Sequence, residues 1–247
     1  MDLVELPESA RERHPWERSR ARAIERIVRS SALTKVGTIL DYGCGDAYTG
    51  RALLERLHAE HLVGLDVNLS EAQRDAFAGG DSRVLLASDA TALGERRFDL
   101  VLLCDVIEHV EDDGVLLRMA REYLNPGGRV VVTVPAFQSL FTEHDRTLKH
   151  FRRYSLSELE RSVARAGLTV ESSGYLFASL LPARAAGKLL ELARGARNGG
   201  EGLGGWRGGK ALSKLLGAAL FADNSLLLSL SELGIKMPGL SAWALCR

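Results

Sequence analysis

The stretch ILDYGCGDAYTG, residues 39–50, decides the fold of this chain. An aliphatic run ends in Asp41, the turn Gly43-Cys44-Gly45 follows, and the apolar residues from Tyr48 onward have helical spacing. This pattern is typical of a β-strand that enters an α-helix through a tight glycine turn. Such a turn can bind a nucleotide-like cofactor, but a single glycine pair does not tell which one.

Around this turn, strand-like and helix-like segments alternate five times. The strand-length apolar runs are GTILDY, HLVGLD, RVLLA, FDLVLLC and GRVVVTV. Helical periodicity predicts helices over residues 16–31, 48–58, 69–77 and 115–124, and one more from the N-cap Ser155 through Ala166. Strands that are apolar on both faces indicate a mostly parallel sheet covered by helices on both sides. We therefore predict an α/β, Rossmann-like fold with seven strands.

The last third of the chain departs from this alternation. Residues 199–209 hold seven glycines in eleven positions, which predicts a flexible loop, and basic amphipathic stretches flank it between residues 179 and 221. The final GLSAWALCR has strand character. We expect a helical insertion before the last strand that forms a pocket wall or a dimer surface, in preference to a membrane contact.

The composition argues against several classes of protein. The 247 residues carry 32 basic and 32 acidic side chains, so we expect no nucleic-acid partner. The chain shows no signal-peptide segment and no run of about 18 uncharged apolar residues, which predicts a cytoplasmic protein without stable membrane insertion. The sequence is also compatible with peripheral contact of the protein with a membrane surface. Cys44, Cys104 and Cys246 lack the close spacing of a zinc site or a redox dithiol and should be buried.

Acidic residues follow several of the predicted strands, and ligands of open α/β sheets bind where parallel strands end. The first two strands end in Asp41 and Asp66, the third runs into Asp89, and the fourth runs into Asp105. An acid after the second strand can accept hydrogen bonds from both hydroxyls of a ribose. The turn lacks the third glycine of dinucleotide sites, and Asp46 beside it would repel a pyrophosphate. A ligand with a cationic amino or sulfonium group, such as S-adenosylmethionine (SAM), fits this turn better.

Five motifs in order resemble those of the class I SAM-dependent methyltransferases, over residues 37–176. They are ILDYGCGDAYTG, VGLDVN, SDAT, FDLVLLCDVIEHV and LNPGGRVVVTVP. The resemblance implies that SAM is the cofactor and S-adenosylhomocysteine (SAH) the product, with Asp66 at the ribose and Asp89 at the adenine amine. It also implies cofactor contacts from Asp41, Gly43, Cys44, Gly45, Val67, Ala90, Cys104 and Asp105. Ala47 departs from the pattern, because many relatives carry glycine there.

Two stretches could serve the methyl acceptor. Asp105, Glu108 and His109 would share one face of a helical turn, a spacing that can hold a divalent ion or position a histidine base. The stretch HDRTLKHFRRYS, residues 144–155, contains His150, and we interpret His150 and His109 as the candidate catalytic bases.

A metal ion is the less favoured alternative at this place. In ubiquinone-pathway and small-RNA methyltransferases a similar acid-x-x-Glu-His turn binds a metal, and the RNA branch adds a later histidine that His150 resembles. The same turn also occurs in relatives that need no metal. We therefore expect a metal-free site, with Asp105, Glu108, His109 and His150 as the ligands if a divalent ion does bind.

The arginines after His150 and the helix near the N-terminus are interpreted from their positions in the chain. Arg152 and Arg153 could clamp an anionic acceptor or pair with acids such as Glu158. We interpret the helix that begins near Trp16 as a lid over the cofactor, because a helix outside the alternation has no obligatory place in the core. The predicted parts are an N-terminal helical lid (residues 1–36), a SAM-binding core (37–178), a helical insertion (179–238) and a final core strand (239–247).

These observations predict a SAM-dependent methyltransferase that acts on a small-molecule or glycan-type acceptor. Oxygen is favoured over nitrogen or carbon as the methylated atom. The glycan or lipid-linked option comes from the HDRTLKHFRRYS stretch, which resembles that of bacterial methyltransferases of surface-glycan pathways. The alternatives are a nicotinamide-dependent oxidoreductase and a SAM-binding protein without catalysis, and both a monomer and a homodimer fit the sequence.

Overall fold

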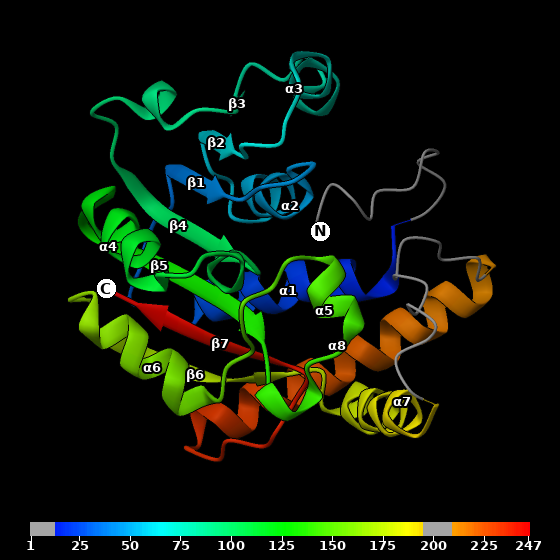
Figure 1. Ribbon diagram of the computed structural model, residues 1–247. Helices are drawn as coiled ribbons and strands as arrows, with labels where there is room; N and C mark the ends of the chain where they lie inside the picture. The colour runs from blue at the N-terminus through cyan, green and yellow to red at the C-terminus, as the bar shows by residue number, and fades with distance from the viewer. Residues whose placement is uncertain (1–12, 195–208) are drawn as a thin grey trace.

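The computed structural model describes residues 13–194 and 209–247. The predicted glycine-rich loop, apart from Gly209, lies outside the described residues, as do the first twelve residues of the chain. Figure 1 shows the arrangement of the helices and strands.

The described strands and helices follow the predicted alternation. The strands are β1 (Thr38–Tyr42), β2 (His61–Leu65), β3 (Val84–Ala87), β4 (Phe98–Cys104), β5 (Leu124–Pro135), β6 (Val170–Leu176) and β7 (Ser241–Cys246). The α-helices are α1 (Pro15–Arg29), α2 (Tyr48–Arg56), α3 (Glu71–Ala78), α4 (Asp113–Glu122), α5 (Glu143–Thr147), α6 (Leu156–Arg165), α7 (Leu181–Arg194) and α8 (Lys210–Glu232). Short 3-10 helices are η2 (Ala90–Leu93), η3 (Ile107–His109), η4 (Gln138–Leu140) and η5 (Ala178–Leu180).

Within the described part of the chain, the strands form one seven-stranded sheet in the order β3-β2-β1-β4-β5-β7-β6. Every neighbouring pair from β3 to β5 is parallel, whereas β7 runs antiparallel to both β5 and β6. The order reverses between β1 and β4, and such a switch point opens a crevice at the carboxyl ends of the strands. The predicted fold, with its helical insertion before the last strand, is confirmed.

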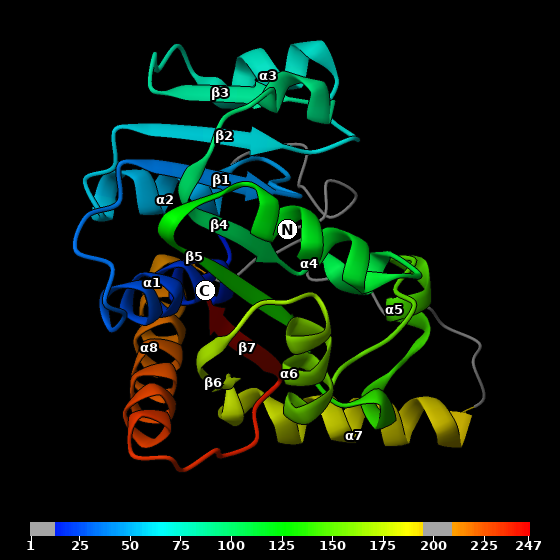
Figure 2. The same ribbon diagram turned by 90° about the vertical axis from the view of Figure 1, so that its left-hand side faces the viewer.

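The sheet is buried on both faces because side chains alternate along each strand. Ile39 lies in the core with α1, α2 and α8, whereas its neighbour Leu40 lies in the core with α4 and α6. Figure 2 shows these two helical layers on opposite sides of the sheet. Val101 and Val131 are likewise fully buried in the centre of the sheet.

Helix α1 belongs to this core, so our reason for interpreting it as a peripheral lid was wrong. Its Ile24 and Ile27 are fully buried, and it packs along α8. His14 caps its first turn by accepting a hydrogen bond from the backbone N–H of Trp16 at 3.1 Å. Closure of α1 over a cofactor stays a prediction.

Helix α8 bears on the expectation that the chain has no membrane-spanning helix. Among the described residues it is the one helix whose length and apolar composition match a membrane span, although the sequence showed no uncharged run of that length. It nevertheless packs on α1 and β6. Buried Asn224 accepts a hydrogen bond from the backbone N–H of Phe177 at 2.9 Å and donates one to Ser19 Oγ at 3.2 Å. Because these contacts lie within the domain, α8 is a helix of the fold.

Candidate cofactor and acceptor site

The glycine turn lies between β1 and α2 and places backbone atoms at the carboxyl ends of the parallel strands. Gly43 and Gly45 have positive φ angles of 71° and 55°, where a side chain would be strained. The Gly43 N–H donates to Leu65 O of β2 at 2.7 Å, and a Cβ on Gly43 would lie 2.6 Å from a methyl of Val106. Ala47 also has a positive φ of 61° and begins α2 without a side-chain cap. The turn is therefore held in place by its neighbours.

Asp41 fixes this turn from inside the protein. The side chain is buried, and its Oδ2 accepts a hydrogen bond from the backbone N–H of Gly50 in α2 at 2.9 Å. Burial raises the pKa of Asp41 to about 6. The structure thus places Asp41 behind the turn, where it positions α2.

Asp66 lies at the end of β2 and joins two backbone segments. Its Oδ2 accepts a hydrogen bond from the Gly45 N–H at 3.0 Å, and its Oδ1 accepts one from the Asn68 N–H at 2.9 Å. Each carboxylate oxygen can accept a further hydrogen bond. A ribose diol could therefore bind without displacing either backbone contact. The next residue, Val67, is 73% exposed and offers an apolar side chain at the same edge.

Asp89 and Ala90 follow β3 and are exposed. Asp89 accepts a hydrogen bond from the backbone N–H of Thr91 at 2.7 Å, which lowers the pKa of its carboxyl and begins η2. In contrast, Cys44 and Cys104 are buried and free, as is Cys246, which confirms the prediction of buried cysteines. Burial raises the pKa of Cys104 to about 12, so its thiol stays protonated.

Sequence reasoning missed two arginines near the glycine turn, Arg20 in α1 and Arg13 just before α1. Arg20 is buried and forms an ion pair with Asp105 after β4, and Arg13 forms one with Asp46 beside the glycine turn. Glu17 lies between them and accepts from Arg13 Nη1 at 3.1 Å. Glu17 and Arg20 are three positions apart in α1 and share one face of that helix, so this spacing could have indicated a charged face. These two ion pairs therefore provide both positive and negative charges where the methionine end of SAM is predicted to lie.

The predicted helical turn with Asp105, Glu108 and His109 on one face is wrong. Asp105 has a φ of 57°, and the helix that follows is the short 3-10 segment η3. This backbone turns the Asp105 carboxylate toward Arg20 and toward Thr133, whose hydroxyl donates to it at 3.3 Å.

Glu108 and His109 instead meet His150. One potential ligand atom from each of these three residues lies within 4.8 Å of the others, and the two imidazole rings are 4.5 Å apart in an edge-to-face arrangement. Glu108 is fully buried, and both of its carboxylate oxygens lack a hydrogen-bond partner in the described structure. Burial, and next the charge of Asp105, raises the pKa of Glu108 well above its ordinary value.

Asp145 organises the other side of His150, and sequence reasoning missed this role. Its Oδ1 contacts His150 Nδ1 at 3.1 Å and accepts from Arg153 Nε at 2.8 Å, and its Oδ2 accepts from Arg184 Nη2 at 2.9 Å. Burial alone would raise the pKa of Asp145, but the hydrogen bond to His150 and the charge of Arg153 outweigh it and lower the pKa. An ionised carboxylate only accepts, so His150 Nδ1 donates, and a neutral His150 ring carries its lone pair on Nε2.

The two neighbouring arginines have structural partners. Arg153 pairs with Asp145, and Arg152 donates to the backbone carbonyls of Val110 and Glu111. Glu158, which we considered as a partner, instead accepts from the backbone N–H of Ser155 at 2.7 Å.

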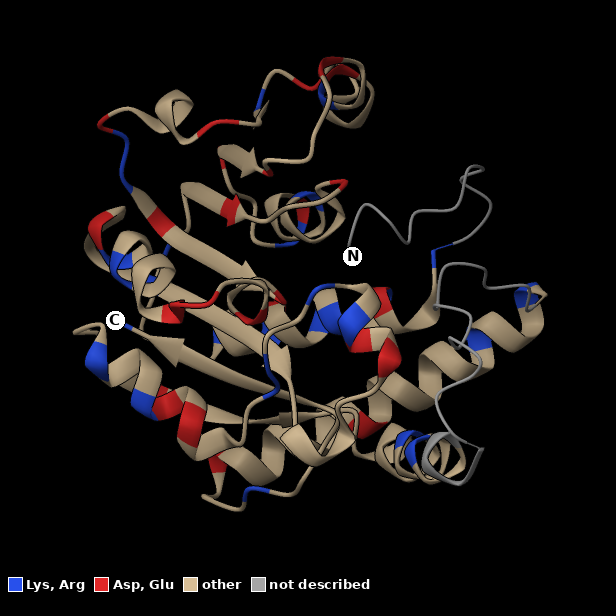
Figure 3. Cartoon of the chain, viewed as in Figure 1, with Lys and Arg blue, Asp and Glu red and all other residues tan. Residues whose placement is uncertain are grey.

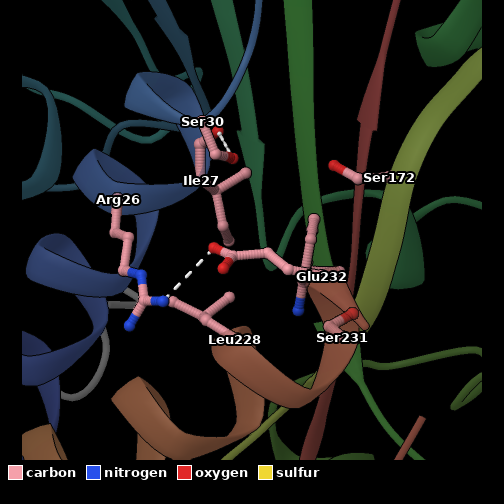
Figure 4. A pocket seen from close by; sticks show the side chains of 8 residues that line it. Arg26, Ile27, Ser30, Ser172, Leu228, Ser231 and Glu232 are labelled. Atoms are coloured by element: carbon pink, nitrogen blue, oxygen red, sulfur yellow. Dashed lines mark hydrogen bonds and ion pairs between the residues drawn. The ribbon is translucent and has the colours of Figure 1, made fainter. Parts of the chain in front are cut away.

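A separate small cavity lies between the C-terminal parts of α1 and α8 and the sheet (Figure 4). Its volume is about 40 Å³, and it is lined by α1, α8 and the last two strands. The lining includes Ser172 Oγ and Trp243 Nε1, which have no hydrogen-bond partner in the described structure. A space of this size suits ordered water and is too small for an adenosyl group.

Comparisons with known proteins agree with this geometry. A family model described as a methyltransferase domain matches residues 13–173, which is more than half of the chain. The chain belongs to the class I SAM-dependent methyltransferases. This confirms the predicted family and its SAM cofactor, and it leaves no support for the nicotinamide-dependent oxidoreductase.

Two curated relatives carry the same name. The chain is 34% identical over 159 residues to the ubiquinone biosynthesis O-methyltransferase of Azorhizobium caulinodans, covering 56% of this chain and 62% of that protein. It is 40% identical over 99 residues to the ubiquinone biosynthesis O-methyltransferase of Cereibacter sphaeroides, covering 38% of this chain and 39% of that protein. The matches thus span less than two thirds of these relatives.

Solved structures share the fold at low sequence identity. A putative sarcosine dimethylglycine methyltransferase from Galdieria sulphuraria aligns with a TM-score of 0.56 at 14% identity, covering 94% of this chain and 85% of that one. The N-methyltransferase NodS from Bradyrhizobium japonicum, solved with SAH, aligns with a TM-score of 0.51 at 19% identity, covering 66% of this chain and 80% of that one.

Proposed function

We propose that the protein transfers the methyl group of SAM to a hydroxyl oxygen of a small-molecule acceptor, in the cytoplasm. The observation that carries the proposal is the Asp145–His150 pair, which lies beside His109 and Glu108. Glu108 and His109 follow the carboxyl end of β4, and the cofactor motifs lie at the carboxyl ends of the same parallel strands. The names of the curated relatives support an oxygen acceptor. A glycan-type acceptor rests only on the sequence resemblance.

The cofactor would lie across the carboxyl ends of β1, β2 and β4. Asp66 would accept from the ribose hydroxyls, and exposed Asp89 would accept from the adenine amine. The methionine end has both an ammonium and a carboxylate, and it would reach the Arg20–Asp105 pair. Each charge would then find an opposite charge, with the ammonium at Asp105 and the carboxylate at Arg20.

The transfer itself is an in-line displacement. The acceptor oxygen forms a bond to the methyl carbon while the bond from that carbon to the sulfonium breaks, which leaves neutral SAH. The hydroxyl proton must leave the acceptor, and His150 Nε2 can take it because Nδ1 is held by Asp145. His109 packs against the His150 ring and would orient it.

A divalent ion is the second candidate at the same place, because Glu108 keeps two buried oxygens without a partner. Glu108, His109 and His150 Nε2 would hold the ion, with Asp105 excluded by its contact with Arg20. A bound ion would supply a positive charge that acidifies an acceptor hydroxyl. His150 cannot be both a ligand through Nε2 and the base, so the two candidates exclude each other.

The test begins with cofactor binding and then asks for the acceptor. Asp66→Ala should weaken SAH binding, measured by calorimetry, by roughly 100-fold, since it removes hydrogen bonds to a charged acceptor. Glu71→Ala, an exposed acid at the start of α3, is the matched control. Unchanged SAH affinity in Asp66→Ala would contradict the cofactor placement.

Methyl-labelled SAM incubated with the protein and a lysate from a strain lacking the gene identifies the acceptor class. We expect enzyme-dependent label in a small-molecule fraction, with the methyl on oxygen. Label in protein or nucleic acid, or on nitrogen, would contradict the proposal. Tight SAH binding without any label would favour the non-catalytic alternative.

A further inference from the structure

Helix α8 has two different faces along its length. Leu220, Asn224, Leu227 and Leu228 are buried against the domain. Leu212, Leu215, Ala219, Ala222 and Leu226 are exposed, and their spacing of three and four residues places them on one face, away from the buried one. We refer to these five residues as the α8 stripe. Leu215 is 69% exposed and Leu226 57% exposed, which is unusual for a continuous apolar row on a soluble protein.

The α8 stripe explains why this helix matches a membrane span in composition. Only 28% of its apolar window is buried within the protein. A helix that belongs to the core of a soluble protein would be mostly buried. Because buried Asn224 holds α8 to Phe177 and Ser19, the helix cannot leave the domain to cross a bilayer without breaking these contacts. An apolar face that stays attached to a domain can lie on a membrane surface.

Positive charges lie on one flank of α8, between the α8 stripe and the buried face. Lys210 and Lys214 are exposed in the first turns of α8, and residues 210–222 contain no acid. Figure 3 shows only Lys and Arg colouring on this part of α8. The exposed Arg22 of α1 adds a further cation, with its guanidinium 5.4 Å from the ring centre of Phe221. Lysine side chains beside an apolar face can reach headgroups while the face contacts acyl chains.

We propose that the α8 stripe docks the protein on an anionic lipid surface. The charge distribution favours lipid over a second copy of the chain. Residues 210–222 offer no acid with which a second copy could neutralise Lys210 and Lys214, whereas anionic headgroups attract both lysines. The proposal differs from the expectation, made from the sequence, that the insertion forms a dimer surface or a pocket wall, and that expectation stays a prediction. Docking does not depend on methyl transfer, so its failure and that of the proposed function are separate results.

The experiment is flotation of the full-length protein with vesicles of phosphatidylcholine, with and without phosphatidylglycerol. We expect binding to the anionic vesicles that weakens as salt rises. Leu215→Glu and Leu226→Glu should each weaken binding by roughly tenfold or more, since each removes an apolar contact and adds a repelled charge. Val115→Glu is the matched control, because Val115 is 53% exposed on α4, which packs on the opposite face of the sheet from α8.

A second pair of variants tests the charges. Lys210→Glu with Lys214→Glu should remove the preference for phosphatidylglycerol vesicles. Thermal melting and SAH titration verify the fold of each variant, and Leu226→Ser replaces Leu226→Glu if the latter does not fold. Absence of binding to anionic vesicles overturns the proposal, as does binding that Leu215→Glu and Leu226→Ser leave unchanged. Self-association that Leu215→Glu abolishes, without vesicle binding, also overturns it and assigns the stripe to a second copy.

Discussion

The carboxylate of Asp145 and the Nδ1 atom of His150 lie 3.1 Å apart, and this contact determines which nitrogen of His150 can react. Arg153 and Arg184 bind the same carboxylate and keep it ionised. The second ring nitrogen then carries the lone pair of a neutral imidazole. A side chain held in this way is suited to accept a proton, as a general base requires.

Replacing His150 by alanine should therefore lower turnover without affecting the cofactor. We expect kcat to fall by roughly 100-fold to 10,000-fold, the usual contribution of a positioned base, with SAH affinity unchanged. The acceptor fraction identified by methyl labelling supplies the assay. His144→Ala, in the same stretch but outside the three-residue cluster, is the control and should keep most activity. Equal activity of His150→Ala and the unmodified protein would remove His150 from the chemistry.

Glu108 provides the test for a metal ion. Burial raises the pKa of its carboxyl, which favours the protonated form, and Gln is a neutral side chain of the same shape, so we expect Gln to replace it at little cost in the metal-free protein. We expect Glu108→Gln to melt within a few degrees of the unmodified protein, and neither Mn²⁺ nor a chelator to change the Tm of either. A rise in Tm with Mn²⁺ that Glu108→Gln abolishes would instead support the ion and displace His150 as the base.

The sequence predicts the sheet well because local patterns determine it. Runs such as LVLLC, residues 100–104, are apolar at every position, which is the pattern of a strand buried on both faces. In the same way, Ser155 and Glu158 form the predicted capping box at the start of α6, since both partners lie within one helical turn.

The arrangement of the site depends on contacts that spacing cannot show. Arg20 and Asp105 are 85 positions apart and meet only after α1 packs on the sheet. Asp105 was assigned to a helical face because its left-handed backbone conformation has no signature in the sequence of an acidic residue. Asp145 received no role from the sequence, and only the fold shows that it contacts His150.

Arg20 should recognise the amino-acid end of the cofactor. Arg20→Gln removes a buried positive charge beside Asp105, so we expect SAH affinity to fall by roughly 10-fold to 100-fold. Binding of 5′-methylthioadenosine, which lacks the amino-acid group, should stay unchanged. Arg20→Lys should recover part of the SAH affinity, and Arg18→Gln, on an exposed position of the same helix, should have no effect. An equal loss for both ligands would show that Arg20 only supports the fold.

Asp41 predicts how stability depends on pH. Its pKa rises from 3.8 to about 6 in the folded protein because the carboxyl is buried. A raised acid pKa means that the folded state holds the proton more tightly than the unfolded state, so Asp41 lowers stability as pH increases through the window from 3.8 to about 6. Above that window the loss is constant, at about 2–3 kcal/mol for a shift of this size.

Asp41→Asn removes this titration and keeps a carbonyl oxygen that can accept from Gly50. Urea unfolding measures the free energy of unfolding of each protein at acidic pH, below the window, and at slightly alkaline pH. Between these two pH values, the free energy of unfolding of the variant should rise by about 2 kcal/mol relative to that of the unmodified protein. The comparison uses the change with pH, so any constant effect of the amide on packing cancels. Asp75→Asn, at an exposed position of α3, should show no such gain. A stability difference for Asp41→Asn that does not vary with pH would mean that Asp41 stays ionised in the fold, held by the Gly50 N–H and by the positive charge of Arg20.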